Sequence, residues 1–236
     1  MNSYQTQSIP MTKEGRFIRS GLLGGLAINA ALVVYSKLGA PSISLISLTG
    51  PLVILLVYAL LTWFILPILD RLYPRVIKLA LLFGLIAGVI FAGEIILEYI
   101  LLPSDNTTFG LVEFGSVFCV WFLSGLIAAY GSKSMRQGIL TAVTTAMIAS
   151  LIWDVVLLIT LHAFHGTPQQ ASVWQAEGEY QDFVRSGMKD FYTFTVEDMM
   201  GATFYHLLLG PIAAAALGAV GGLLGKLIYG KHRPAG

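Results

Sequence analysis

The chain consists of long apolar stretches separated by short polar connections, and six of the stretches reach the length of a membrane span. A helix needs about 20 mostly apolar residues to cross the hydrocarbon core of a bilayer. Residues 38–69 contain no charged side chain, and the second span is expected within them. The predicted spans are Ser20–Lys37, Pro51–Asp70, Val76–Leu102, Val112–Gly131, Gly138–Ala163 and Met199–Lys226. The pattern predicts an all-α, six-span membrane domain over residues 20–228, with tails at residues 1–19 and 229–236.

The first apolar stretch follows three basic residues, Lys13, Arg16 and Arg19, as the apolar part of a signal peptide does. A polar lead of about twenty residues is long for a signal peptide, and Leu38-Gly39-Ala40 is a poor cleavage site. The sequence therefore favours a first helix that is retained.

Basic residues gather in alternate connections. With the N-terminus placed in the cytoplasm, only Lys37, Arg185 and Lys189 of the 14 Lys and Arg residues fall on the outer side. The acidic residues expected outside are Asp105, Glu113, Glu177, Glu179, Asp182, Asp190, Glu197 and Asp198. The positive-inside rule then places both termini in the cytoplasm. In a prokaryote the expected location is the cytoplasmic membrane.

The longest connection, residues 164–198, lies outside between the fifth and sixth spans. Within it, apolar residues recur at helical spacing over Glu177–Phe194, and the opposite face is charged. This predicts an amphipathic helix that is too polar to span. Two placements are open: the helix lies on the outer lipid interface, or it covers the mouth of the bundle as a lid.

Composition excludes several classes of protein. Charged residues make up 11% of the chain and the mean hydropathy is +0.77, whereas a soluble domain carries about 25% charged residues. A net charge of +1 gives no reason to expect a nucleic-acid partner, and the single cysteine, Cys119, excludes an internal disulfide. The chain contains no nucleotide-binding loop, nucleophile elbow or zinc-protease motif. We therefore expect no cofactor and no enzymatic activity.

Polar residues inside the spans are the strongest indication of function, because ionisable groups at membrane depth are costly. Glu94 and Glu98 lie in the third span, Asp154 in the fifth and His206 in the sixth, and Asn29 lies in the first. At 1.5 Å per residue, four of them fall roughly 10–13 Å from the outer ends of their spans, with Glu98 one turn nearer the outside. We expect these residues to form one outward-facing site.

A carboxylate–histidine group of this kind can hold a proton, a monovalent ion, a divalent metal or the amine of an organic cation. The alternative is a network of hydrogen bonds that fixes the bundle. A separate metal site is conceivable where His162 and His165 face Glu197 and Asp198, although unpaired surface histidines are the favoured interpretation.

Small residues four positions apart let helices approach closely in lipid. Gly21 and Gly25 fit this spacing, as do Gly84 and Gly88, and the sixth span carries Gly218, Gly222 and Gly225. These last glycines pack within the chain, or they form the contact to a second copy or a partner subunit. Gly210-Pro211 predicts a kink in the same span.

These observations predict an integral membrane protein whose partner is the lipid bilayer. The favoured function is a small transporter or a solute-binding membrane subunit that uses the acidic and histidine site. The alternative is a non-catalytic structural or assembly protein that packs against partner helices. A metal-dependent membrane enzyme is a third, less favoured interpretation.

Overall fold

The structure, a computed structural model, describes residues 10–101 and 107–231, and all regular elements in these residues are helices. They are α1 (Lys13–Gly39), α2 (Leu45–Leu60), the π-helical turn η1 (Leu61–Ile65), α3 (Leu66–Leu72), α4 (Pro74–Leu101), α5 (Thr107–Ser132), α6 (Met135–Ala163), α7 (Pro168–Glu177), α8 (Glu179–Ser186) and α9 (Phe191–Lys231).

Six helical segments are long and apolar enough to cross a membrane, which confirms the predicted all-α, six-span fold. They are Lys13–Gly39, Leu45–Leu72, Pro74–Ile100, Gly110–Ser132, Met135–Ala163 and Phe191–Tyr229. The chain is therefore an integral membrane protein. Which side of the membrane each end faces stays a prediction from the charges.

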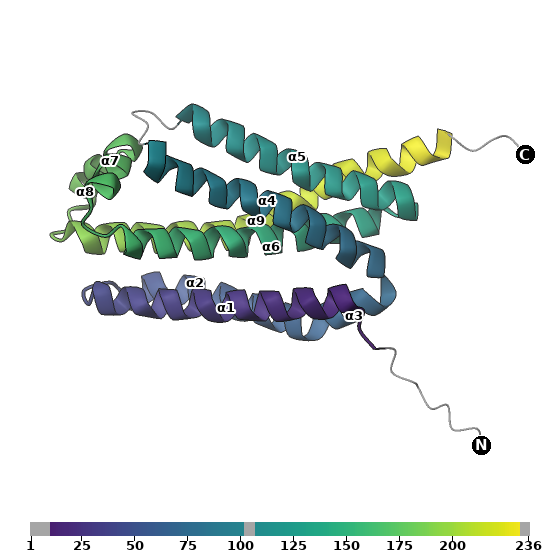
Figure 1. The fold of residues 1–236 in the computed structure, drawn as a ribbon, viewed down its shortest axis with the longest axis horizontal. Helices are drawn as coiled ribbons and strands as arrows, with labels where there is room; N and C mark the ends of the chain where they lie inside the picture. Colours follow the sequence, from purple (N-terminus) through teal and green to yellow (C-terminus); the bar gives the residue numbers. More distant parts are fainter. Residues whose placement is uncertain (1–9, 102–106, 232–236) are drawn as a thin grey trace, which may run out of the picture.

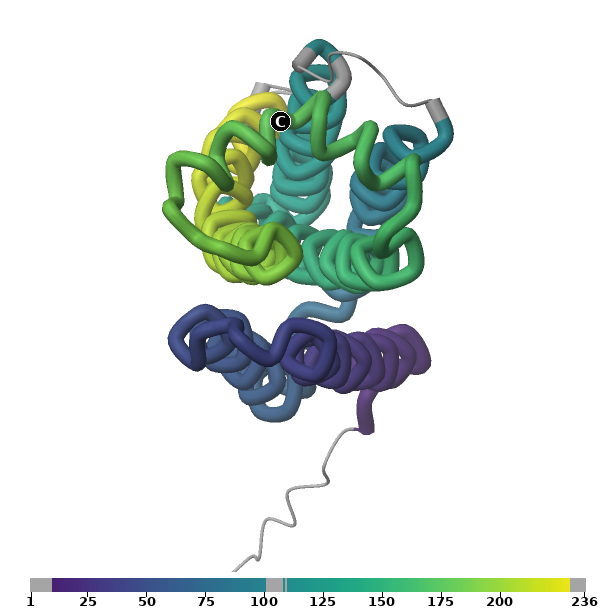
Figure 2. The backbone as a smooth tube through the Cα atoms, turned by 90° about the vertical axis from the view of Figure 1, so that its left-hand side faces the viewer, coloured from purple at the N-terminus to yellow at the C-terminus, as the bar shows by residue number. Residues whose placement is uncertain are grey.

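The helices form two layers (Figures 1 and 2). Helices α1, α2 and α3 make one layer, and α4, α5, α6 and α9 form a four-helix group beside it. The short helices α7 and α8 lie across one end of this group, where α4 and α6 end and α9 begins. We call this the capped end. The described part of the chain begins and ends at the opposite end.

The apolar core is divided in the same way. One cluster fills the interface between the layers and includes Leu26, Val33, Leu151 and Met200. The other lies inside the four-helix group and is built around Phe91, with Trp121, Trp153 and small alanines. The four-helix group thus has an aromatic interior of its own.

The connection between α6 and α9 differs in part from the prediction. One amphipathic helix was expected over Glu177–Phe194, but Gly178 and Gly187 adopt positive φ angles of 83° and 69° and interrupt it. Glycine enters this left-handed region at no steric cost. Only α8 is the separate amphipathic helix, and the residues from Phe191 onward already belong to α9.

The apolar side of α8 packs on the first turn of α9, with the ring centroids of Tyr180 and Phe191 4.5 Å apart. Helix α7 is held to the end of α6, because Gln170 Nε2 donates to the Leu161 carbonyl at 3.0 Å. The segment therefore lies over the end of the bundle (Figure 2), the second of the two expected placements.

Helices α5 and α9 make direct backbone contact in the half of the bundle away from the cap. A Cβ atom on Gly125 would lie 2.7 Å from Gly218 Cα, and one on Gly221 or Gly225 would collide with a carbonyl oxygen of α5. Gly222 faces Met135 of α6. The glycines of α9 thus pack within the chain, the first of the two alternatives raised by their spacing. Gly84 and Gly88 likewise pack against isoleucines of α6.

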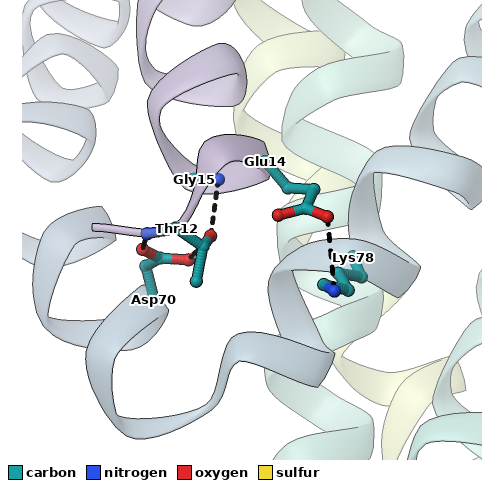
Figure 3. Close-up of polar contacts among 5 residues, drawn as sticks. All are labelled: Thr12, Glu14, Gly15, Asp70 and Lys78. Carbon is teal, nitrogen blue, oxygen red and sulfur yellow. Dashed lines mark hydrogen bonds and ion pairs between the residues drawn. The ribbon is translucent and has the colours of Figure 1, made fainter. Parts of the chain in front are cut away.

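The start of α1 is fixed to α3 and α4 by polar contacts (Figure 3). Thr12 caps the helix by accepting from the Gly15 amide at 2.9 Å. The buried Asp70 carboxylate accepts from both the amide and the hydroxyl of Thr12, at 2.7 and 2.6 Å. Any side chain at Gly15 would collide with that carboxyl group. Glu14 and Lys78 add an ion pair at 3.2 Å.

Pro211 creates a polar link between the two layers. Proline has no N–H, so the Leu207 carbonyl one turn earlier loses its helical partner. The hydroxyl of the buried Tyr58, on α2, donates to this carbonyl at 2.7 Å. Helix α9 continues through Pro211, and its C-terminal half turns toward α5 (Figure 1).

The glycine contact predicts different effects for two alanine substitutions on α9. Gly221→Ala should lower the free energy of unfolding by about 1–3 kcal/mol, because the new methyl group meets the α5 backbone. Gly201→Ala is the control, since a Cβ atom there meets nothing within 4 Å, and should be neutral or slightly stabilising. Unfolding in mixed micelles with a denaturing detergent measures both. Equal effects would contradict the proposed contact.

The hydrogen bond from Tyr58 predicts that Pro211→Ala reduces the destabilisation caused by Tyr58→Phe. Tyr58→Phe should destabilise the protein by about 1–3 kcal/mol, because the Leu207 carbonyl is left buried without a donor. In a Pro211→Ala background the same substitution should cost much less, because the alanine introduced there supplies the missing helical N–H. The same unfolding assay compares the two backgrounds. An equal loss in both would mean that Tyr58 acts by packing alone.

Candidate functional site

The structure distributes the five predicted site residues over three places in the bundle. Glu94 and Glu98 lie on α4, facing α5 and the cap. His206 points into the aromatic interior of the four-helix group. Asp154 and Asn29 lie at the interface between the two layers. Helical spacing placed them at similar depth, but they do not share one face of the bundle.

Asp154 and Asn29 connect helices. Asp154 is fully buried, and its Oδ1 accepts from the Thr203 hydroxyl of α9 at 2.6 Å. Asn29 is also fully buried, and its Nδ2 donates to the Leu151 carbonyl of α6 at 3.3 Å. Asp154 Oδ2 and Asn29 Oδ1 are buried without a hydrogen-bond partner. The bonds that are made join α1, α6 and α9, as a structural network does.

His206 is enclosed by aromatic rings. It stacks on Trp153 with centroids 3.8 Å apart, and the rings of Phe91 and Phe114 lie 6.2 and 5.9 Å away. Its Nδ1 lies 3.1 Å from the Ala202 carbonyl, which fixes the ring against its own helix. A pocket of about 210 Å³ adjoins His206. Its lining includes Phe118, Trp121, Ser150 and Tyr205.

A groove of about 620 Å³ runs between α4 and α5 near the capped end. Glu94 lines one wall and Glu113 the other. Glu113 is only 6% exposed, and its Oε1 is buried without a hydrogen-bond partner. The remaining lining is apolar or small: Val89, Ile90, Gly93, Leu97, Thr108, Val112 and Ser116.

Two further carboxylates adjoin the groove. The buried Glu98 interacts with Glu94 by hydrogen bonding and electrostatically with Glu113. Glu177, the last residue of α7, interacts with both Glu94 and Glu98 from the cap. Four acidic side chains from α4, α5 and α7 therefore gather around one end of the groove. We call Glu94, Glu98, Glu113 and Glu177 the acidic cluster.

Two basic side chains of the capped end are held by other groups. Arg185 pairs with Asp182 at 2.8 Å on the outer side of α8. Lys37 donates to the carbonyls of Pro41 and Ile43, both at 2.7 Å. Neither cation contributes to the acidic cluster through these contacts.

Sequence reasoning missed Glu113 and Glu177 as site residues. Glu113 was assigned to the outer acids because it stands next to Val112, where the fourth span was expected to start. Helix α5 in fact begins at Thr107, and the spanning segment begins at Gly110. Glu113 is therefore nearly one turn into the spanning segment, and its position beside the aromatic residues Phe114 and Phe118 was the available signal. Nothing in the sequence showed that α7 would bring Glu177 back over α4.

His162, near the end of α6, is partly buried and lies beside two hydroxyl groups, whereas His165 is exposed and contacts the ring of Tyr192. His162 Nε2 lies 3.0 Å from Ser36 Oγ, and His162 Nδ1 lies 3.4 Å from the Tyr192 hydroxyl. Glu197 accepts from the Ser44 amide at 2.7 Å. In residues 10–101 and 107–231, no group of three or more His, Cys, Asp or Glu side chains is placed to hold a metal ion.

Burial and crowding raise the pKa of the two cap carboxylates. Burial is the main cause for Glu177, with Glu98 next, and raises its pKa to about 8. Glu179 has a pKa raised to about 7 by burial and by Asp198 and Asp182. Asp190, just before α9, shows the opposite behaviour, because hydrogen bonds from Thr193 lower its pKa.

No protein-family model, curated protein or solved structure matches this chain. Its function has to be argued from the geometry of the groove and its surroundings.

The raised pKa values predict that the cap loosens as the pH rises. Both carboxyl groups have a higher pKa in the docked cap than in the undocked chain, so they bind more protons when the cap is docked. Docking therefore weakens as the pH rises from about 4.5 to about 8. Hydrogen exchange of α7 and α8, corrected for intrinsic rates, should show at least about tenfold less protection at about pH 9 than at about pH 5.

The matched control is the double substitution Glu177→Gln and Glu179→Gln, which removes both titrating groups. Its cap should keep similar protection at both pH values. Protection in the unsubstituted protein that is constant, or that rises with pH, would contradict the assignment.

Proposed function

We propose that this protein is a small membrane transporter, or the solute-binding membrane subunit of one, and that its solute is a cation bound in the groove between α4 and α5. The observation that carries the proposal is that Glu94 and Glu113 face this groove from two different spanning helices. Opposed carboxylates attract a positive charge into a region of low dielectric.

The energy of burial supports a binding role over a purely structural one. A carboxylate at the centre of a spanning helix costs about 2.5–3.5 kcal/mol even on the lower scales, and the cost is smaller for Glu113, which lies three residues from the start of its span. Thr203 offsets part of this cost for Asp154, although Asp154 Oδ2, like Glu113 Oε1, has no hydrogen-bond partner. Glu113 differs from Asp154 because its side chain lines a groove. A cation in that groove would interact electrostatically with Glu113 and with the neighbouring acids.

The shape of the bundle also supports this function. Helices α5 and α9 touch through their glycines in the half away from the cap. The capped half contains the groove, the aromatic pocket and the acidic cluster. A site that close helix packing blocks on one side of the membrane is what a carrier needs in one of its alternating states.

The alternative is a non-catalytic assembly protein. Gly21, Gly24 and Gly25 of α1 have no atom within 4 Å of a Cβ position, so this small-residue face is free to contact a partner helix. On this alternative the carboxylates have no solute, and neutral substitutions should stabilise the protein without removing any activity.

The proposal predicts a cation-specific charge movement. Proteoliposomes adsorbed on a solid-supported membrane should give a transient current when Na⁺, K⁺, Ca²⁺, tetramethylammonium or tetraphenylphosphonium is added at constant ionic strength. At least one of these cations should give a current that Glu94→Gln and Glu113→Gln each reduce by at least about tenfold, because each removes a buried negative charge.

The matched control is Glu197→Gln. Glu197 lies at the same end of the bundle, bonded to Ser44 and away from the groove, and its substitution should leave the current unchanged. If the protein gives no current above empty liposomes with any of these cations, the assembly alternative takes the place of the transport proposal.

A further inference from the structure

We infer that the solute is an organic cation, a protonated or quaternary amine or a similar onium ion with an apolar body, and that it enters the groove sideways from the lipid. This inference rests on the proposed function and names the class of its substrate. Three features of the groove carry it: its lining, its buried acceptor and its opening.

The lining suits an amphiphilic cation better than a metal ion. Calcium takes six to eight oxygen ligands and magnesium an octahedral set, but the groove presents two carboxylates on walls that are otherwise mainly aliphatic. A volume of about 620 Å³ lies in the range of pockets for drug-sized molecules, about 300–1,000 Å³. The charged group of such a molecule would face Glu94 and Glu113, and its apolar part would cover Ile90 and Leu97.

Glu113 indicates a ligand independently of the acidic cluster. Its side chain lines the groove, the residue is only 6% exposed, and Oε1 has no hydrogen-bond partner. A buried acceptor left unpaired is expensive, because it loses its water without gaining a donor. An ammonium group in the groove would provide a positive charge beside this side chain.

The groove opens toward the lipid. Its rim includes Val89 and Val112, which are 69% and 65% exposed within two spanning helices. Apolar side chains exposed on spanning helices face acyl chains. An amphiphilic cation dissolved in the bilayer already places its charge near the interface and its body among the acyl chains. It would reach Glu94 and Glu113 without crossing a polar vestibule.

The test measures equilibrium binding of radiolabelled tetraphenylphosphonium to the full-length protein in lipid nanodiscs. Tetraphenylborate, an anion of the same shape, controls for partition into lipid. We expect saturable binding of the cation alone, which excess Na⁺, K⁺ or Ca²⁺ at constant ionic strength does not displace. Glu113→Gln should weaken binding at least about tenfold, and Glu197→Gln should leave it unchanged.

Val112→Trp provides a second variant that changes no charge. The larger ring should obstruct the rim of the groove and weaken tetraphenylphosphonium binding, and it keeps the test decisive if Glu113→Gln does not fold. Binding that survives both Val112→Trp and Glu94→Gln would overturn the assignment of this groove.

The outcomes separate this inference from the proposed function. Currents with Na⁺, K⁺ or Ca²⁺ that depend on Glu94 and Glu113, without saturable tetraphenylphosphonium binding, would overturn the organic-cation inference and leave cation transport standing. Neither currents nor binding with any of these cations would overturn both. Saturable binding that depends on Glu113 and is not displaced by inorganic cations would support the inference.

Discussion

The backbone contact between α5 and α9 is the constraint on which the rest of the four-helix group depends. Lipid tails are as apolar as leucine, so helices in a bilayer associate through close packing and hydrogen bonds rather than through the hydrophobic effect. Gly125, Gly218, Gly221 and Gly225 provide that packing in one half of the bundle only. In the other half larger residues such as Phe114 and Phe118 separate the helices, and the groove lies beside them.

A second constraint explains why the buried polar residues have two different roles. Every backbone carbonyl in a membrane needs a donor, and Pro211 removes the one that Leu207 would have. Tyr58 supplies the replacement from the other layer, and Asn29 adds a second hydrogen bond between the layers, whereas Asp154 joins α6 to α9 within the four-helix group. These side chains are used in holding helices together. Glu94 and Glu113 line an open groove instead, which is why we assign the solute to them.

Hydrophobic length and helical periodicity were enough to predict the six spans, because both depend on local sequence alone. They were not enough to predict which side chains meet. Asp154 and Trp153 are neighbours in sequence, yet Asp154 contacts Thr203 at the layer interface and Trp153 stacks on His206. Helix rotation is set by tertiary packing. The left-handed turn at Gly166, which leads α6 into α7 and so brings Glu177 toward α4, is likewise set by the fold.

The cap and the groove are electrostatically connected, and this gives the proposed site a physical means of sensing its own occupancy. Glu177 of the cap interacts repulsively with Glu94 and Glu98 when these groups are ionised. A cation in the groove would offset that repulsion and favour the docked cap. Because coupling between two equilibria is reciprocal, docking of the cap would in turn tighten cation binding by the same factor. The acid that helps to close the site would therefore also help to retain its solute.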